Sequence, residues 1–179
     1  MQMGDKREKA NPDAAGSGAQ DIGAAGALRF VVSGRMARPI DDVFEAVVDP
    51  AQLSSFFTTG GARGRLETGA VVTWDFHDFP GAFPVEVVEV VKNERITLRW
   101  ASSEPASGDE AGPRQTTVTM HFESLEDGRT LVRISEFGWQ PTPAGLKASY
   151  GNCEGWTGML CAMKMWLEHR LQLRQGFYR

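Results

Sequence analysis

Cysteine is scarce in this chain. The two cysteines, Cys153 and Cys161, lie on a segment whose periodicity predicts one helix. There they would be roughly 12 Å apart, which is too far for a disulfide. Unpaired cysteines favour a reducing compartment, so we expect a cytoplasmic location. The sequence has no CxxC or HExxH motif, so we expect neither a metal nor a cofactor.

The sequence also lacks long apolar runs and basic clusters. No apolar stretch approaches the ~20 residues that a membrane-spanning helix needs, and the start of the chain lacks the pattern of a secretory signal. The net charge is −4 at pH 7, which argues against nucleic acid as a partner. Hydrophobic residues make up 41% of the 179-residue chain, which is enough for one domain with a core.

Large apolar side chains are almost absent from residues 1–26, which are rich in Gly, Ala, Asp and Lys. Such a stretch cannot bury enough surface to offset the entropy of ordering it. We therefore predict a disordered tail over residues 1–26 and a single domain over residues 27–179.

Strand patterns dominate the first three quarters of that domain. Residues 28–36 predict a strand, because their large apolar side chains share one face. A short helix capped by Asp41 or Asp42 should follow, and then a second over about 51–57. Residues 58–139 contain several segments in which apolar and polar side chains alternate, separated by turn signals, which predicts a meander of about six strands.

One long amphipathic helix is predicted near the C-terminus, running to about Arg174, where Arg170 and Arg174 would suit the helix dipole. Its apolar positions recur at spacings of three and four: Cys153, Trp156, Leu160, Met163, Leu167 and Leu171. Antiparallel strands with one polar face must cover the other face, and this helix is the large apolar element left to do so. We therefore predict an α+β helix-grip fold, in which a curved antiparallel sheet of about seven strands surrounds the helix.

The order of short motifs resembles the START-like, or SRPBCC, superfamily, and is most similar to the homologues of the activator of the heat-shock-protein-ninety ATPase. The resemblance covers about Leu28 to Leu171. The matching segments are residues 39–44 with Asp49-Pro50, Gly60-Gly61, Gly69, Trp74, residues 87–90, 95–100, 117–119 and 128–130, and Gly155-Trp156.

This resemblance implies that the domain over residues 27–179 binds a small hydrophobic or amphipathic ligand, of lipid, polyketide or aromatic type, between sheet and helix. Aromatic and methionine side chains would give such a cavity an adaptable apolar lining. The residues expected to line it are Phe56, Trp74, Phe76, Ile96, Leu98, Trp100, Met120, Phe122, Trp156, Leu160 and Met163. A fully packed core is the alternative for each of them.

Two further residues are candidates for polar contacts with a ligand. Arg99 could anchor a ligand carboxylate, although a salt bridge across strands is the better interpretation for both Arg99 and Arg133. Glu136 alternates along its strand with Val132 and Ile134, so the three side chains project from the same face. If that face points inward, Glu136 is a buried carboxylate with a raised pKa.

Three polar residues cluster at the end of one predicted strand: Asp75, His77 and Asp78. We interpret them as surface residues rather than catalytic ones. The alternation places Asp75 and His77 on the face opposite Trp74.

Three functions follow from these observations, in order of preference. The first is a binding protein rather than an enzyme, with no catalytic residue. The second is a cyclase- or hydrolase-like enzyme that uses a cavity carboxylate or histidine. The third is a chaperone-associated module, which the family resemblance would connect with the stress response. A homodimer also stays open as an oligomeric state.

Overall fold

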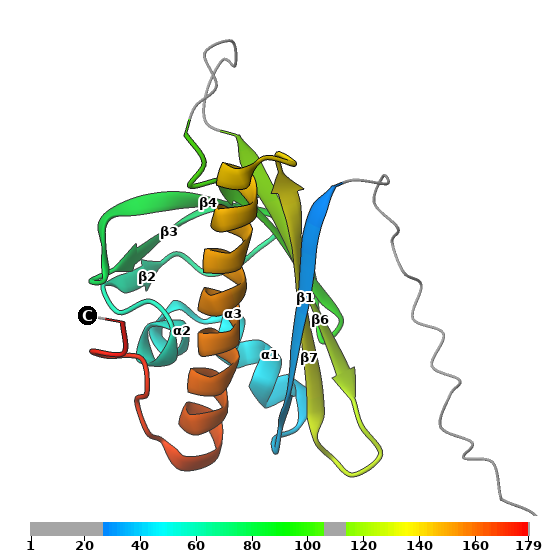
Figure 1. Ribbon diagram of the computed structural model, residues 1–179. Helices are drawn as coiled ribbons and strands as arrows, with labels where there is room; N and C mark the ends of the chain where they lie inside the picture. Colours follow the sequence, from blue (N-terminus) through cyan, green and yellow to red (C-terminus); the bar gives the residue numbers. More distant parts are fainter. Residues whose placement is uncertain (1–26, 106–113, 179) are drawn as a thin grey trace, which may run out of the picture.

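A computed structural model describes residues 27–105 and 114–178 (Figure 1). The tail predicted over residues 1–26 lies outside the described residues, as does most of the loop expected between residues 101 and 114. The described part is a seven-stranded sheet with one long helix packed across its concave face.

The sheet is antiparallel throughout, with the strand order β1-β7-β6-β5-β4-β3-β2. From β1 the chain crosses to the opposite edge and then returns strand by strand until β7 pairs with β1. The strands are β1 Leu28–Met36, β2 Gly61–Arg63, β3 Val71–Phe76, β4 Phe79–Val91, β5 Arg95–Ala101, β6 Gln115–Ser124 and β7 Thr130–Trp139. The predicted sheet is confirmed.

Two short helices, α1 (Ile40–Val48) and α2 (Pro50–Phe56), form the crossover between β1 and β2. The prediction that Asp41 or Asp42 caps α1 is wrong. The N-cap is Pro39, which offers no side-chain acceptor, and both aspartates lie in the first turn, where their charge still suits the helix dipole. A side-chain cap begins the next helix instead, because Asp49 Oδ1 accepts the amide of Ala51 at 3.0 Å.

The long helix α3 (Pro143–His169) begins at Thr142, whose hydroxyl accepts the amide of Gly145 at 3.1 Å. The prediction that this helix continues to Arg174 is wrong. Arg170 adopts a left-handed conformation with φ of 59°, and its amide bonds back to the carbonyls of Met165 and Trp166, an arrangement that ends helices. Leu171, expected on the apolar side of the helix, is 55% exposed.

The core lies between α3 and the inner face of the sheet. Alternation along the strands decides which side chains enter it: in β6, Val118, Met120 and Phe122 are buried while the residues between them are not. α3 packs against the edge strand β1 at Gly34, where an added Cβ would be in ordinary van der Waals contact with Leu160, 3.6 Å from its Cβ. The helix therefore fills the concave side of the sheet, as the helix-grip prediction requires.

Replacing the α3 cap, Thr142→Ala, should lower the free energy of unfolding by about 1 kcal/mol, because the amide of Gly145 loses its acceptor. Urea denaturation monitored by tryptophan fluorescence measures the change. Thr157→Ala is the matched control, since this exposed hydroxyl bonds a carbonyl within α3 and its loss should change stability by less than about 0.5 kcal/mol. Equal effects of the two substitutions would contradict a capping role for Thr142.

Candidate functional site

The most unusual side chain in the core is Glu136 on β7. Three alternate residues of this strand, Val132, Ile134 and Glu136, face inward and are each 0% exposed. Glu136 therefore occupies a position that the strand pattern normally gives to an apolar residue. The inward orientation that the sequence left open is the one the structure has.

Three nitrogen donors hold the Glu136 carboxylate. Trp100 Nε1 on β5 and Asn152 Nδ2 on α3 both donate to Oε1 at 2.9 Å, and Trp156 Nε1 on α3 donates to Oε2 at 2.8 Å. The buried Thr116 hydroxyl, on the neighbouring strand β6, also lies close enough to lower the pKa of this carboxylate. The site therefore joins β5, β7 and α3 around one acidic group.

Burial raises the pKa of Glu136, and hydrogen bonding by Thr116, Trp100, Trp156 and Asn152 partly opposes this shift. None of these groups carries a charge. Hydrogen bonds from neutral donors favour the ionised form, but they do not supply the Coulombic attraction that a cation would. Glu136 is thus a carboxyl group held in an apolar interior with its acceptor positions partly filled by neutral partners.

Aromatic rings surround this carboxylate. Trp156 stacks on Trp100 and on Phe57, with ring centroids 5.4 and 5.3 Å apart. Trp74 meets both tryptophans edge to face, and Phe83 does the same with Trp100 at 5.8 Å. We call these five residues, Phe57, Trp74, Phe83, Trp100 and Trp156, the aromatic cluster. Its half-buried members, Phe83 and Trp100, are the points where it comes closest to solvent.

The residues predicted to line a cavity all occupy the interior between sheet and helix. Trp100 is half-buried, and the others are buried: Phe56, Trp74, Phe76, Ile96, Leu98, Met120, Phe122, Trp156, Leu160 and Met163. Their rings and aliphatic chains pack on one another in a continuous core. Contact of these residues with a ligand stays a prediction.

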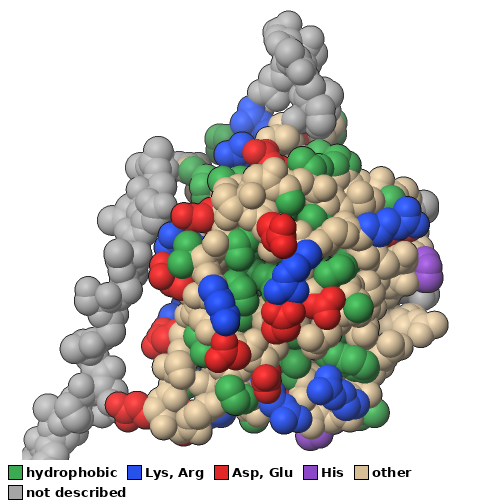
Figure 2. Space-filling view, turned by 180° about the vertical axis from the view of Figure 1, so that it is seen from behind, with side chains coloured by type: hydrophobic (Ala, Val, Ile, Leu, Met, Phe, Trp, Pro, Cys, Tyr) green, Lys and Arg blue, Asp and Glu red, His purple; other side chains and the backbone are tan. Residues whose placement is uncertain are grey.

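Arg99 does not join this site. It projects from the outer face of the sheet, where its guanidinium lies 3.3 Å from Glu86 Oε2 on the neighbouring strand. Arg133 pairs in the same way with Glu123 at 2.6 Å. Viewed from behind, acidic and basic side chains lie side by side over this face (Figure 2). Both arginines therefore form the cross-strand salt bridges that the sequence favoured.

The cluster suggested by Asp75, His77 and Asp78 is not a single site. Asp75 is half-buried and His77 is exposed. Asp78 is 5% exposed and forms a short ion pair with Arg174, which is 6% exposed. Sequence reasoning missed this pair, because the two residues are far apart in the chain and Arg174 was assigned to the helix.

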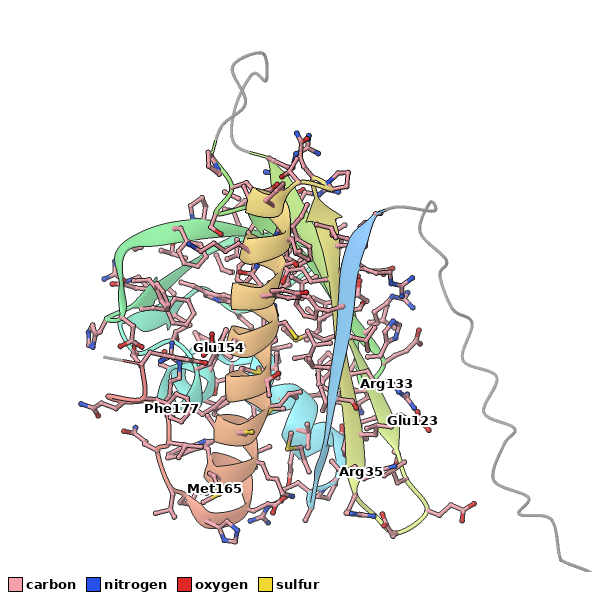
Figure 3. All side chains as sticks on the ribbon, viewed as in Figure 1. Arg35, Glu123, Arg133, Glu154, Met165 and Phe177 are labelled. Carbon is pink, nitrogen blue, oxygen red and sulfur yellow. The ribbon has the colours of Figure 1, made fainter. Side chains whose placement is uncertain are left out.

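Two hollows flank the segment that follows α3, which we call the C-terminal segment (residues 171–178). The first, of about 340 Å³, is lined by Cys153, Glu154, Thr157, Gly158, Cys161 and Ala162 of α3 and by Leu173, Arg174, Phe177 and Tyr178. In Figure 3, Glu154 and Phe177 both lie on the side of α3 that faces away from β1.

The second hollow, of about 160 Å³, lies between α2 and the C-terminal segment. Its lining residues are Ser54, Ser55, Phe56, Phe57, Thr59, His77, Gln172, Arg174 and Gln175. Arg174 therefore lines both hollows.

Metal and disulfide sites find no support in the part of the chain that the structure describes. Within it, no group of three or more His, Cys, Asp or Glu side chains could hold a metal ion. Cys153 and Cys161 are both free thiols, as their predicted separation required. Among the described helices, none is both long enough and apolar enough to span a membrane.

A curved antiparallel sheet closed around a long C-terminal helix defines a helix-grip protein of the START-like type. The family model for "Activator of Hsp90 ATPase homolog 1-like protein" matches residues 37–168, so the chain belongs to that family. No curated protein sequence matches the chain.

Solved structures share this fold. Protein SSP2350 of Staphylococcus saprophyticus is 25% identical, with a TM-score of 0.64 over 82% of this chain and 96% of that one. The Aha1 dimer of Colwellia psychrerythraea is 17% identical, with a TM-score of 0.62 over 79% and 97% of the two chains. DynU16, a protein in the dynemicin biosynthetic locus, is 22% identical, with a TM-score of 0.65 over 82% of this chain and 49% of its own.

The raised pKa of Glu136 should make stability depend on pH in a characteristic direction. The folded protein holds this proton more tightly than the unfolded chain. The resulting contribution is fully present below the ordinary carboxyl pKa of 4.5 and is lost as the pH rises through the folded pKa. Urea denaturation at a series of pH values should therefore show that wild type loses stability relative to Glu136→Gln as the pH rises.

Asn152→Ala keeps the carboxylate but removes one donor that favours its charged form, so this loss of stability should extend to higher pH. A constant difference between wild type and Glu136→Gln at all pH values would show that the pKa of Glu136 is the same in the folded and unfolded states.

Proposed function

We propose that this protein binds a small amphipathic molecule in the interior between the sheet and α3, and that Glu136 is its polar contact. The observation that carries the proposal is the placement of one fully buried carboxylate, held by three neutral donors, inside an aromatic cluster. A buried acidic group without a cationic partner costs stability, and such costs are concentrated at functional sites.

Asn152 indicates where a ligand would meet this carboxylate. Of the three donors, Trp156 is buried and stacked between two rings, whereas Asn152 is half-buried and carries a short amide on the face of α3. A ligand hydroxyl or amine could take the place of the Asn152 amide. The preferred ligand is therefore an apolar molecule with one hydrogen-bond donor.

The apolar part of the ligand would lie against the aromatic cluster. Phe83 and Trp100 are half-buried, so these two rings can move aside with less loss of packing than the fully buried Trp74 or Trp156. The neighbour DynU16 is a protein in a biosynthetic locus, which is compatible with a small-molecule ligand for this fold.

The same geometry favours binding over catalysis. The groups that hydrogen-bond or closely approach Glu136 are two indoles, one amide and the Thr116 hydroxyl, none of which titrates near neutral pH. General acid–base catalysis by two groups would need a second titratable side chain within reach. We therefore rank ligand binding above the enzyme alternative.

The free cysteines also fit a reducing, cytoplasmic setting.

Three probes that share one ring system and differ in the polar group test this proposal: naphthol, naphthylamine and naphthoate. Naphthol and naphthylamine should quench tryptophan fluorescence and, at about tenfold excess over Kd, raise Tm by roughly 3–6 °C. Naphthoate should bind at least about tenfold more weakly, because its carboxylate would face that of Glu136.

Glu136→Gln should reduce the difference between the donor probes and naphthoate. Glu123→Gln, on the outer face of the sheet, is the matched control and should bind all three as wild type does. The proposal fails if no probe shifts Tm and native mass spectrometry of the purified protein finds no co-purified small molecule.

A further inference from the structure

The C-terminal segment does not continue the helix from which it emerges. After Arg170 the chain reverses and runs back beside α3 toward α2 (Figure 1). Three of its apolar side chains point to solvent: Leu171 and Phe177 are each 55% exposed and Leu173 is 38% exposed. Burial of apolar surface therefore contributes little to holding the segment in place.

Two side chains provide most of the attachment. The Arg174 guanidinium pairs with Asp78 in the β3–β4 turn and lies over the rings of Phe76 and Tyr178, 5.7 and 4.5 Å from their centroids. The Tyr178 hydroxyl donates to the Glu154 carbonyl at 3.3 Å. Arg174 lines both hollows, so the segment is loosely packed around this attachment. Few buried contacts and one dominant attachment are typical of a segment with a low free energy of local opening.

The same attachment covers one end of the aromatic cluster. Phe76, beneath the Arg174 guanidinium, contacts Phe57 at 5.0 Å and stacks on Phe83 at 6.0 Å. Phe57 in turn stacks on Trp156, which holds Glu136. Displacement of Arg174 would therefore uncover rings that lead directly to the proposed ligand contact.

We propose that the C-terminal segment is a movable cover over the interior, closed by the Arg174–Asp78 ion pair, and that its release admits the ligand. The role of this cover in ligand entry rests on the proposed ligand-binding function. Its opening can be measured with no ligand present. Opening separates a buried cation from a buried anion. Both groups then gain hydration, which offsets part of the lost attraction. A cover of this kind changes how fast a ligand enters and leaves more than how tightly it binds.

Cys153 is a natural reporter of this opening. It is half-buried in the first hollow, beneath the segment, whereas Cys161 in the same hollow is exposed. The Cys161→Ala background leaves Cys153 as the one thiol of the 179-residue chain. Its rate of reaction with a thiol reagent such as dithionitrobenzoate then measures how often the segment is displaced, with no ligand present.

In this background, Arg174→Ala should raise the rate of Cys153 labelling and the acrylamide quenching of tryptophan. The labelling rate should rise at least about tenfold, because loss of one partner of a buried pair favours the open state. Gln175→Ala, a neighbouring exposed residue of the same segment, is the control and should leave both quantities unchanged. Tyr178→Ala removes the second attachment without leaving a buried charge unpaired. It should raise the labelling rate as well, so the test does not depend on the folding of Arg174→Ala.

Unchanged labelling and quenching in both Arg174→Ala and Tyr178→Ala would overturn the cover. Stopped-flow binding of naphthol separates this outcome from failure of the proposed function. Faster association and dissociation with a similar Kd in Arg174→Ala support the cover. Accelerated labelling without naphthol binding in any variant would support an opening segment while contradicting the ligand site. A third outcome is that Arg174→Ala labels rapidly but binds and releases naphthol at the wild-type rates. That result would overturn the role of the segment in ligand entry.

Discussion

The hydrogen bonds of Glu136 are the constraint on which the rest of the interior depends. A carboxylate on β7 accepts one donor from β5 and two from α3, so the sheet and the helix are tied together by directional bonds as well as by apolar contact. Hydrophobic attraction is non-directional, whereas these donors fix the position of α3 over the sheet at named atoms. The orientation of Trp156, and through it of Phe57 and Trp100, follows from this arrangement.

Much of the fold was predictable from the sequence, because two local signals were strong. Alternation in segments such as residues 95–100 and 117–122 identified strands and their inner faces, and spacings of three and four around Trp156 identified α3. The alternation along β7 also indicated that Glu136 could face inward, because it projects from the same face of the strand as Val132 and Ile134. These signals work because burial on one side imposes a period on the sequence.

The features that escaped prediction depend on contacts between distant residues or on single backbone conformations. The apolar spacing of Leu171 continues the pattern of α3, yet a left-handed residue at Arg170 ends the helix first. Nothing near Asp78 in the sequence indicates that its partner is Arg174. The three donors to Glu136 come from β5 and α3, so a pattern within one strand could not identify them. Whether an interior position contacts other side chains or a ligand is likewise not encoded in periodicity.

The sheet order has a consequence for how the chain acquires its structure. β1 pairs along its length with β7, so that Met36 lies opposite Thr130. The strands β2 to β6 all lie between these two in the sequence. During synthesis the first strand must wait until β7 has left the ribosome before it gains its partner. Until then its apolar face and its unbonded backbone are open to wrong associations, and closure of this pair imposes the high contact order that slows folding.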